Sequence, residues 1–355
     1  MSQVHSLPSP AELLAALVAL PAPPGQEGAV RDYLAAQLDT LALPHRTDAK
    51  GNLLTCPGGA LPERPRVVVT AHMDEIALLV TGHGFDIEVA PLGGLFPWKW
   101  GEGPVEILPL AGGEPVPAIL GFGSIHTTSP RSVAQAMRDG KSVSWADISF
   151  FTGLPPEEQT RRGIGVGSRV VMARERRRVQ TLGKHVGAYF LDDRADCVAW
   201  LLALAELKTA GIGAEVLFVA TTSEEVGGEG AQYALRSLPA PPDVCVALEI
   251  GPHTPDAPLS LTAHPSVWIT DTYAAMAPGD IAAVIAAGRS AGLAVQTQAV
   301  TRGGSDATIA ATRGLCARPV TLAFAADNSH GFEIMHRDAP ESLGRLLVTY
   351  LSGMA

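Results

Sequence analysis

Histidine and carboxylate side chains accompany several apolar segments of this 355-residue chain, and together they could bind metal ions. The β-branched run at residues 66–70 is followed directly by His72 and Asp74. Later apolar segments carry or precede Asp192 and Asp193, Glu224 and Glu225, Glu249, and His330. Because ligands of open α/β sheets bind beyond the carboxyl ends of the strands, we expect these side chains to meet in one crevice.

These groups have both an ordinary and a functional explanation. Singly, an Asp-Asp pair before a helix is usually a cap, a Glu-Glu pair is usually a solvated loop, and a buried histidine is usually a core residue. Several of them at one sheet edge are hard to explain in this way, because buried carboxylates are costly unless cations compensate them. Imidazole nitrogen and carboxylate oxygen together suit zinc, cobalt or manganese better than calcium or magnesium.

The spacing within two of the segments indicates different roles for neighbouring residues. A two-metal site needs a carboxylate that bridges the ions and a general base beside the bound water. Glu224 and Glu225 are adjacent, so one can bind metal while the other handles the proton. His72 and Asp74 share a face of an extended segment, so Asp74 could hydrogen-bond the far nitrogen of His72 and fix its tautomer.

Alternating helical and strand-like segments are the elements that must position these groups. Residues 10–43 have a helical period that is interrupted at residues 22–25. Further on we expect strands at 52–55, 66–70, 215–221, 244–250 and 319–324, and helices at 194–207, 229–237, 278–291 and 341–351. This order predicts an α/β fold with a mostly parallel sheet flanked by helices.

The segment between residues 76 and 178 differs from the rest of the chain in the length and spacing of its expected elements. Its strand-like pieces are short and separated by glycines, with one weak helical pattern at residues 133–138. Short strands at this spacing predict a small β-barrel-like module. We therefore expect residues 1–75 and 181–355 to form one α/β domain, which residues 76–180 interrupt as a β-rich insert.

Composition narrows the classes of partner. The formal net charge of -10 argues against nucleic acid and anionic membranes as partners. No apolar run reaches the roughly 18 residues of a membrane span, and the N-terminal segment lacks the pattern of a secretory signal. The four cysteines show neither metal-knuckle nor redox spacing and no disulfide framework. We expect a soluble, cytoplasmic protein.

The segments AHMDE, LDDR, TTSEEVG, ALEIG and GGSDA, in this order, resemble the tetrahedral aminopeptidases, the glutamyl or deblocking aminopeptidase family of co-catalytic zinc exopeptidases. The resemblance covers nearly the whole chain. It implies removal of N-terminal residues from short peptides with two divalent metal ions per subunit, zinc or cobalt, with manganese as a further candidate. It also implies that the insert is a dimerisation domain and that the subunits form homo-oligomers, either dimers or hollow dodecamers.

The resemblance also assigns roles to residues of this sequence. It implies that His72 and Glu249 bind one metal, that Glu225 and His330 bind the other, that Asp192 bridges both, that Glu224 is the general base and that Asp74 orients His72. Asp306, in the GGSDA segment, is a candidate substrate contact, and a simple turn is the equal alternative.

Three departures from the family pattern keep alternatives open. Glu249 stands where the aminopeptidases usually have Asp, which keeps an N-acyl-amino-acid deacylase or carboxypeptidase of the same clan as a rival function. Asp196 stands where Gly is usual, and the last segment lacks the usual Arg-Tyr-x-His-Ser-Pro form. His336 is therefore a rival to His330 as the last ligand. Together with Asp196, the altered segment also keeps a metal-free, non-enzymatic scaffold as a second rival function.

Overall fold

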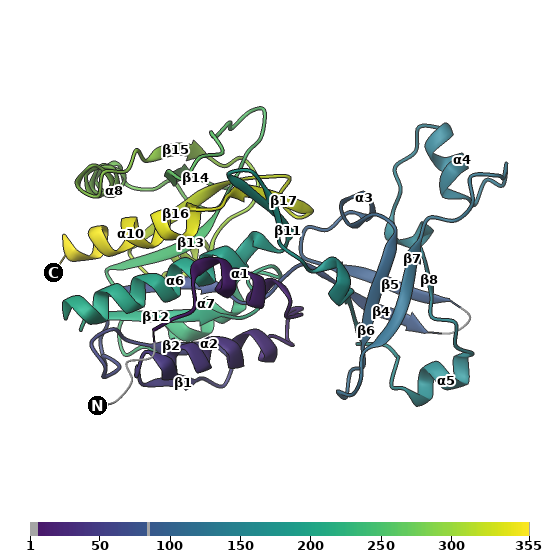
Figure 1. The fold of residues 1–355 in the computed structure, drawn as a ribbon, viewed down its shortest axis with the longest axis horizontal. Helices are drawn as coiled ribbons and strands as arrows, with labels where there is room; N and C mark the ends of the chain where they lie inside the picture. The colour runs from purple at the N-terminus through teal and green to yellow at the C-terminus, as the bar shows by residue number, and fades with distance from the viewer. Residues whose placement is uncertain (1–5, 84–85, 355) are drawn as a thin grey trace.

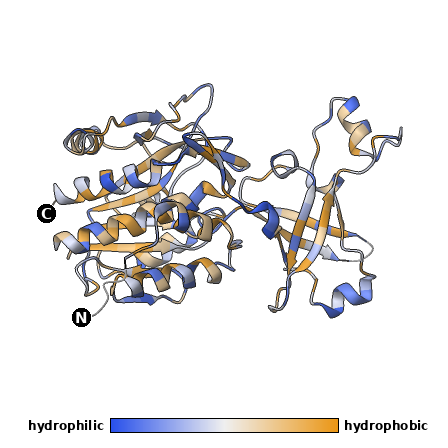
Figure 2. Cartoon of the chain, viewed as in Figure 1, coloured by the Kyte–Doolittle hydropathy of each residue, from blue (hydrophilic) through white to orange (hydrophobic). Residues whose placement is uncertain are grey.

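The computed structural model describes residues 6–83 and 86–354, which fold into two bodies that lie side by side (Figure 1). The larger body contains an eleven-stranded sheet and the smaller body a six-stranded sheet. Apolar residues concentrate in the strands of both sheets, whereas outer helices such as α5 (Pro156–Arg161) are largely hydrophilic (Figure 2). Each body has its own hydrophobic core, as expected for separately packed layers.

The centre of the larger sheet is parallel and most of its flanks are antiparallel. The strand order is β1-β2-β12-β3-β13-β16-β17-β11-β10, with β14 beside β16 and β15 beside β14. The central strands are β12 (Val216–Thr221), β3 (Val67–His72), β13 (Val244–Pro252) and β16 (Arg318–Asp327). The flanking strands are β1 (His45–Thr47), β2 (Leu53–Thr55), β10 (Gln180–Leu182), β11 (His185–Tyr189), β14 (Pro265–Thr270), β15 (Gln296–Ala299) and β17 (Phe332–His336).

Helices cover both faces of this sheet. One core contains residues of α1 (Pro10–Val18), α2 (Gly28–Thr40), α6 (Leu191–Ala210), α8 (Pro278–Ser290) and α10 (Ala339–Ser352), and a second contains residues of α7 (Glu229–Arg236) and α9 (Asp306–Thr312). Along β3, Val67 and Val69 pack into the first core and Val68 into the second. A strand buried on both faces must be apolar throughout, which explains the continuous run of valines.

The smaller body is a curled antiparallel sheet with the strand order β5-β4-β9-β6-β7-β8. Its strands are β4 (Ala77–His83), β5 (Ile87–Leu92), β6 (Gly103–Leu108), β7 (Val116–Gly121), β8 (Ser149–Phe151) and β9 (Arg169–Met172). The connections between these strands carry α3 (Pro97–Trp100), α4 (Val133–Arg138) and α5. Trp100 and Trp145 meet edge to face in its core, with ring centroids 6.1 Å apart.

A buried ion network joins the two bodies beside the end of β3. The Glu75 carboxylate binds the guanidinium groups of Arg177 and Arg194, and all three side chains are buried. Arg177 Nη1 lies 2.9 Å and Arg194 Nη2 lies 2.7 Å from Glu75 Oε2. Both arginines also donate to the backbone oxygen of Leu20. Because unpaired buried charges are strongly destabilising, this network fixes where the smaller body leaves and rejoins the larger one.

The expected fold class is confirmed, with one difference of detail. The parallel centre, the helices on both faces and the separate β-rich body are all present, and the weak helical pattern at residues 133–138 coincides with α4. In the described part of the chain the smaller sheet has two free ends, β5 and β8, so it is curled instead of closed. Its strands lie within residues 77–172, and the division into functional domains at 75/76 and 180/181 stays a prediction.

The helices that the structure describes, within residues 6–83 and 86–354, include none with the length and apolar character needed to cross a bilayer.

Candidate metal centre

The carboxyl ends of the parallel strands open into a cleft of about 900 Å³. Strand β3 ends at His72, β13 carries Glu249, and the loop after β12 carries Glu224 and Glu225. Six of the residues singled out in the sequence line this cleft together: His72, Asp192, Glu224, Glu225, Glu249 and His330. We call this set the cleft floor. The structure thus brings together side chains that lie up to about 260 positions apart in the sequence.

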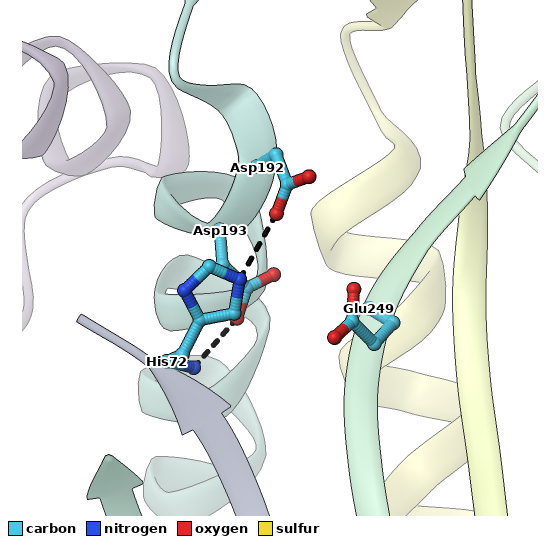
Figure 3. A group of neighbouring side chains, drawn as sticks. All are labelled: His72, Asp192, Asp193 and Glu249. Carbon is cyan, nitrogen blue, oxygen red and sulfur yellow. Dashed lines mark hydrogen bonds and ion pairs between the residues drawn. The ribbon is translucent and has the colours of Figure 1, made fainter. Parts of the chain in front are cut away.

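Two groups of possible metal ligands lie on the cleft floor, and Asp192 belongs to both. The first group is His72, Asp192, Asp193 and Glu249, and the second is Asp192, Glu225 and His330. Within each group the donor atoms lie within 4.8 Å of one another. In Figure 3 the His72 ring lies beside both aspartates, and Glu249 faces them from β13. The peptide bond between Asp192 and Asp193 is cis.

The two carboxylate oxygens of Asp192 face two different histidines. Asp192 Oδ1 lies 3.0 Å from His72 Nε2, and Asp192 Oδ2 lies 3.6 Å from His330 Nε2. His330 Nε2 also lies 3.8 Å from Glu225 Oε2. A carboxylate that presents one oxygen to each of two donor groups has the arrangement that a bridging ligand of two cations requires.

The far side of His72 is held by the backbone and side chain of Asp74. His72 Nδ1 lies 3.2 Å from the Asp74 backbone oxygen and 3.5 Å from Asp74 Oδ1, which leaves Nε2 directed at Asp192. The Asp74 carboxylate in turn accepts hydrogen bonds from the backbone N–H groups of Glu224 and Glu225, at 2.9 and 3.1 Å. Asp74 therefore positions both the histidine and the loop that carries the two glutamates.

Burial disfavours the charged form of the carboxyl groups on the cleft floor. Burial raises the pKa of Glu249 well above its usual range, and the charges of Glu224 and Asp192 add to this effect. Burial also raises the pKa of Glu225 to about 7. For Asp192 burial acts in the same direction, but His330 and His72 outweigh it and hold its pKa low. Divalent cations would allow all these carboxyl groups to ionise, so the donor set and its electrostatics fit metal ions.

Strained backbone flanks the cleft floor. Among the described residues, five non-glycine residues have positive φ, and all except Ala42 lie in segments next to the proposed ligands. They are Phe190 before Asp192, Ser223 before Glu224, Asn328, and His330 itself. Such conformations cost on the order of 1–3 kcal/mol each and persist where the surrounding structure fixes them.

Comparison with known proteins agrees with this geometry. A model of the M42 glutamyl aminopeptidase family matches residues 51–346. This chain belongs to the M42 family. The glutamyl aminopeptidase of Lactococcus lactis subsp. cremoris is 26% identical over 246 residues, which cover 67% of this chain and 65% of that relative. The lysyl aminopeptidase of Pyrococcus furiosus is 27% identical over 244 residues, which cover 67% of this chain and 66% of that relative.

The matched region therefore spans just under two thirds of the length of each of these two relatives. Among solved structures, the TET1 peptidase of Pyrococcus horikoshii superposes with a TM-score of 0.81 at 23% identity, over 97% of this chain and 99% of that one. This similarity shows that the M42 family member described here shares the fold of that peptidase.

Two buried carboxylates of this M42 chain support the proposed ligands: Glu333, which the sequence pattern does not single out, and Asp193, to which the sequence pattern assigns no separate role. Glu333 Oε1 accepts a hydrogen bond from the His330 backbone N–H at 2.9 Å, and Glu333 Oε2 accepts one from the Asp192 backbone N–H at 3.0 Å. Asp193 Oδ2 accepts from the His72 backbone N–H at 2.7 Å. Both residues thus hold the backbone of proposed ligands. The sequence signal for Glu333 is a single acidic residue in the apolar strand β17, and the signal for Asp193 is its place beside Asp192.

Asp306, the candidate substrate contact, is buried behind the cleft floor instead of lining the cleft. It is 2% exposed, and its Oδ2 accepts a hydrogen bond from Thr221 Oγ1 at 2.6 Å. It is the first residue of α9 and directly follows Ser305, whose side chain caps the helix by accepting a hydrogen bond from the Thr308 backbone N–H. The neighbouring glycines, Gly303 and Gly304, do line the cleft.

The rival ligand His336 lies away from both donor groups. Its ring packs edge to face against His185 on the neighbouring strand, with centroids 5.5 Å apart, whereas His330 lies beside Asp192 and Glu225.

Asp196, which stands where the family pattern usually has Gly, is fully buried one helical turn beyond Asp192. Neither of its carboxylate oxygens has a hydrogen-bond partner among the described residues. Burial raises its pKa to about 7.

Proposed function

We propose that this chain is a dinuclear metal-dependent aminopeptidase that releases N-terminal residues from short peptides. Membership of the M42 glutamyl aminopeptidase family supports the reaction class. One observation of the site carries the proposal: the two oxygens of Asp192 face His72 and His330, which belong to two separate donor groups in one cleft. A structural role alone does not account for this arrangement, because buried acidic groups placed close together destabilise the fold.

In this proposal the first cation is held by His72, Asp192 and Glu249, and the second by Asp192, Glu225 and His330. Zinc or cobalt fits this mixed nitrogen and oxygen donor set, and manganese is a third candidate. When bound, two such cations would lower the pKa of the attacking water and polarise the carbonyl oxygen of the scissile bond. Asp193 and Glu333 keep the backbone of the ligands in place from behind.

Glu224 is the proposed general base. It lines the cleft but belongs to neither donor group, so its carboxylate is free to move a proton. Burial raises its pKa well above the usual range, and the charges of Asp306 and Glu225 add to this against the opposing effect of His72. A carboxylate with a raised pKa takes a proton from water more readily, and it can then deliver that proton to the amine that leaves.

The test is hydrolysis of aminoacyl-p-nitroanilides and of unblocked tripeptides by the metal-loaded protein, compared with Glu224→Gln. We expect turnover by the wild type, an N-acetylated tripeptide left intact, and a loss of about 10²–10⁴ in kcat for the variant with its metal content retained. Cleavage of the acetylated peptide alone would favour a deacylase, which Glu249 keeps as a second candidate. A wild type that cleaves no unblocked substrate would refute the aminopeptidase proposal.

We also propose that the chain forms a homo-oligomer in the cytoplasm, either a dimer through its smaller body or a dodecamer. The TET1 peptidase of Pyrococcus horikoshii assembles into a tetrahedron or a large octahedral shell. The smaller body of this chain exposes Ile119 on β7 and Phe151 on β8, at 48% and 71%. Size-exclusion chromatography with light scattering measures the oligomeric state of the chain.

The proposed location in the cytoplasm is supported by the cysteines. All four are unpaired and buried, which fits a reducing compartment.

A further inference from the structure

One wall of the cleft comes from the smaller body. Gly94, Phe96, Trp98 and Lys99, which lie between β5 and β6, line the same cleft as the proposed ligands, and we call this segment the insert wall. The wall touches the metal centre directly, because His330 Nδ1 lies 2.9 Å from the backbone oxygen of Gly94. The side chains that face a bound peptide are therefore partly supplied by the insert.

Lys99 is a half-buried cation on this wall, and its bonding is incomplete. Its Nζ donates to Asn328 Oδ1 at 2.8 Å, and this neutral amide is its one hydrogen-bond partner among residues 6–83 and 86–354. Across the same described residues, no carboxylate oxygen lies within 4.0 Å of Nζ. An ammonium group has three donors, so two of them are available to an anion in the cleft.

Lys99 also lies close to the reacting end of the cleft. A Cβ atom on Gly331 would lie 3.0 Å from Lys99 Cδ, and Gly331 follows His330 directly. An extended chain advances about 3.3–3.6 Å per residue, so the terminal carboxylate of a di- or tripeptide lies roughly 7–11 Å beyond its amino terminus. The carboxylate of a di- or tripeptide whose first bond lies at the metal centre is thus only one or two residue lengths beyond that bond, among the residues that line the cleft with Lys99.

We propose that Lys99 binds the C-terminal carboxylate of di- and tripeptides and so selects short peptides with a free C-terminus. This inference rests on the proposed aminopeptidase function. The ammonium is held in place by Asn328 and lies 5.3 Å from the centre of the Trp98 ring. Burial lowers the pKa of Lys99, against the charges of Glu333 and Asp327, and this shows that the ammonium lacks part of its hydration. Hydrogen bonds that involve a charged group in such a setting are stronger than those in water.

The second cation of the cleft provides a matched control. Arg302 also lines the cleft but is exposed. Like Lys99, it makes no ion pair with a described carboxylate, but no hydrogen bond to a described residue holds its guanidinium in place as Asn328 holds Lys99. An exposed cation is well hydrated and gains less from a further carboxylate. Removal of the Arg302 charge therefore tests whether any positive charge in the cleft is sufficient for a preference for the free acid.

The experiment compares kcat/KM for Leu-Gly-Gly and Leu-Gly-Gly-amide, or for the glutamyl or lysyl pair if these are better substrates. The metal-loaded wild type should prefer the free acid about tenfold, as expected for one hydrogen bond to a charged group, through a lower KM. Lys99→Met should bring the ratio of acid to amide close to one, Lys99→Arg should keep most of it, and Arg302→Met should leave the ratio at the wild-type value. Metal content and melting temperature identify variants that have lost the fold.

The outcomes are distinct. A wild type that cleaves the nitroanilides and both peptides without preferring the free acid overturns the role of Lys99 and leaves the aminopeptidase proposal intact. The same holds if Lys99→Met keeps the wild-type ratio, or if Arg302→Met abolishes it. A wild type that cleaves none of these substrates overturns both proposals, since the second rests on the first.

Discussion

The cleft floor and the insert wall line the same cleft, but they are built in different ways. On the floor, Asp74 supports His72 and Glu225, while Glu333 supports His330 and Asp192. Four of the five proposed ligands thus have a second residue behind them. On the wall, Phe96 and Trp98 are 58% and 63% exposed. In the proposed enzyme, buried hydrogen bonds would therefore fix the metal ligands, whereas peptide selection would depend on exposed side chains with fewer contacts.

The largest effect is expected from Asp192→Asn on the cleft floor. The amide keeps the shape of the side chain but removes the charge that both donor groups share. Metal ions contribute several kcal/mol of transition-state stabilisation, so we expect kcat/KM to fall at least about 10³-fold. Metal analysis should find fewer than two ions per chain. Retention of two ions and of wild-type turnover would show that Asp192 is not the shared ligand.

Asp196→Asn tests how much stability a buried carboxyl group next to the cleft floor costs the protein. The pKa of Asp196 is raised from 3.8 to about 7, mainly by burial. Between pH 4 and 7 the folded chain therefore holds a proton that the unfolded chain has released, and the free energy of unfolding falls as pH rises through this window. Three pKa units correspond to about 4 kcal/mol.

Removal of this carboxyl group should stabilise the metal-free protein by up to about 4 kcal/mol at pH 8 and by little at pH 4. Urea unfolding after treatment with EDTA, at both pH values, measures the difference between variant and wild type. A gain that is the same at pH 4 and pH 8 would rule out this titration as its cause. Glu114→Gln, in an exposed loop of the smaller body, serves as the control for a simple change of net charge.

Glu333→Gln should have a smaller effect on activity, because Glu333 acts through the backbone of the ligands. Both oxygens of its carboxylate accept backbone N–H groups, and a glutamine would direct its NH₂ at one of these donors. Loss of such support typically costs 10- to 100-fold in metal affinity or activity. Titration of the metal-free variant with zinc measures the affinity. An unchanged affinity would mean that the His330 and Asp192 backbones are held by other contacts.

The sequence predicts the floor far better than it predicts its supports or the wall. His72 and Glu249 follow or lie in long buried strands, which are visible as apolar runs. Glu333 lies in the short strand β17, where an acidic residue usually indicates a solvent-facing position, and only the pairing of β17 with β11 and β16 makes it buried. Local sequence cannot show that burial, because the pairing joins segments about 145 residues apart.

The same limit applies to the fold. Strand β15 has the polar sequence QTQA and lies at the sheet edge, so no apolar period indicates it. Lys99 comes from a segment more than 200 residues before Asn328, its partner in the structure. Contacts of this kind depend on how the smaller body is attached, and the buried network of Glu75, Arg177 and Arg194 that fixes the attachment has no signature in the local sequence.

The smallest effect is expected from Trp98→Ala on the insert wall. The Trp98 ring stacks on Phe96, with centroids 5.8 Å apart and planes 17° apart, and it is largely exposed, so its loss should change the free energy of unfolding by less than about 0.5 kcal/mol. An aromatic contact with a substrate side chain is worth about 0.5–1.5 kcal/mol. We therefore expect kcat/KM for Leu-Phe-amide to fall about threefold, with little change for Leu-Gly-amide. Equal losses on both substrates would place the defect in the metal centre, through Gly94 and His330, and would remove the functional distinction between wall and floor.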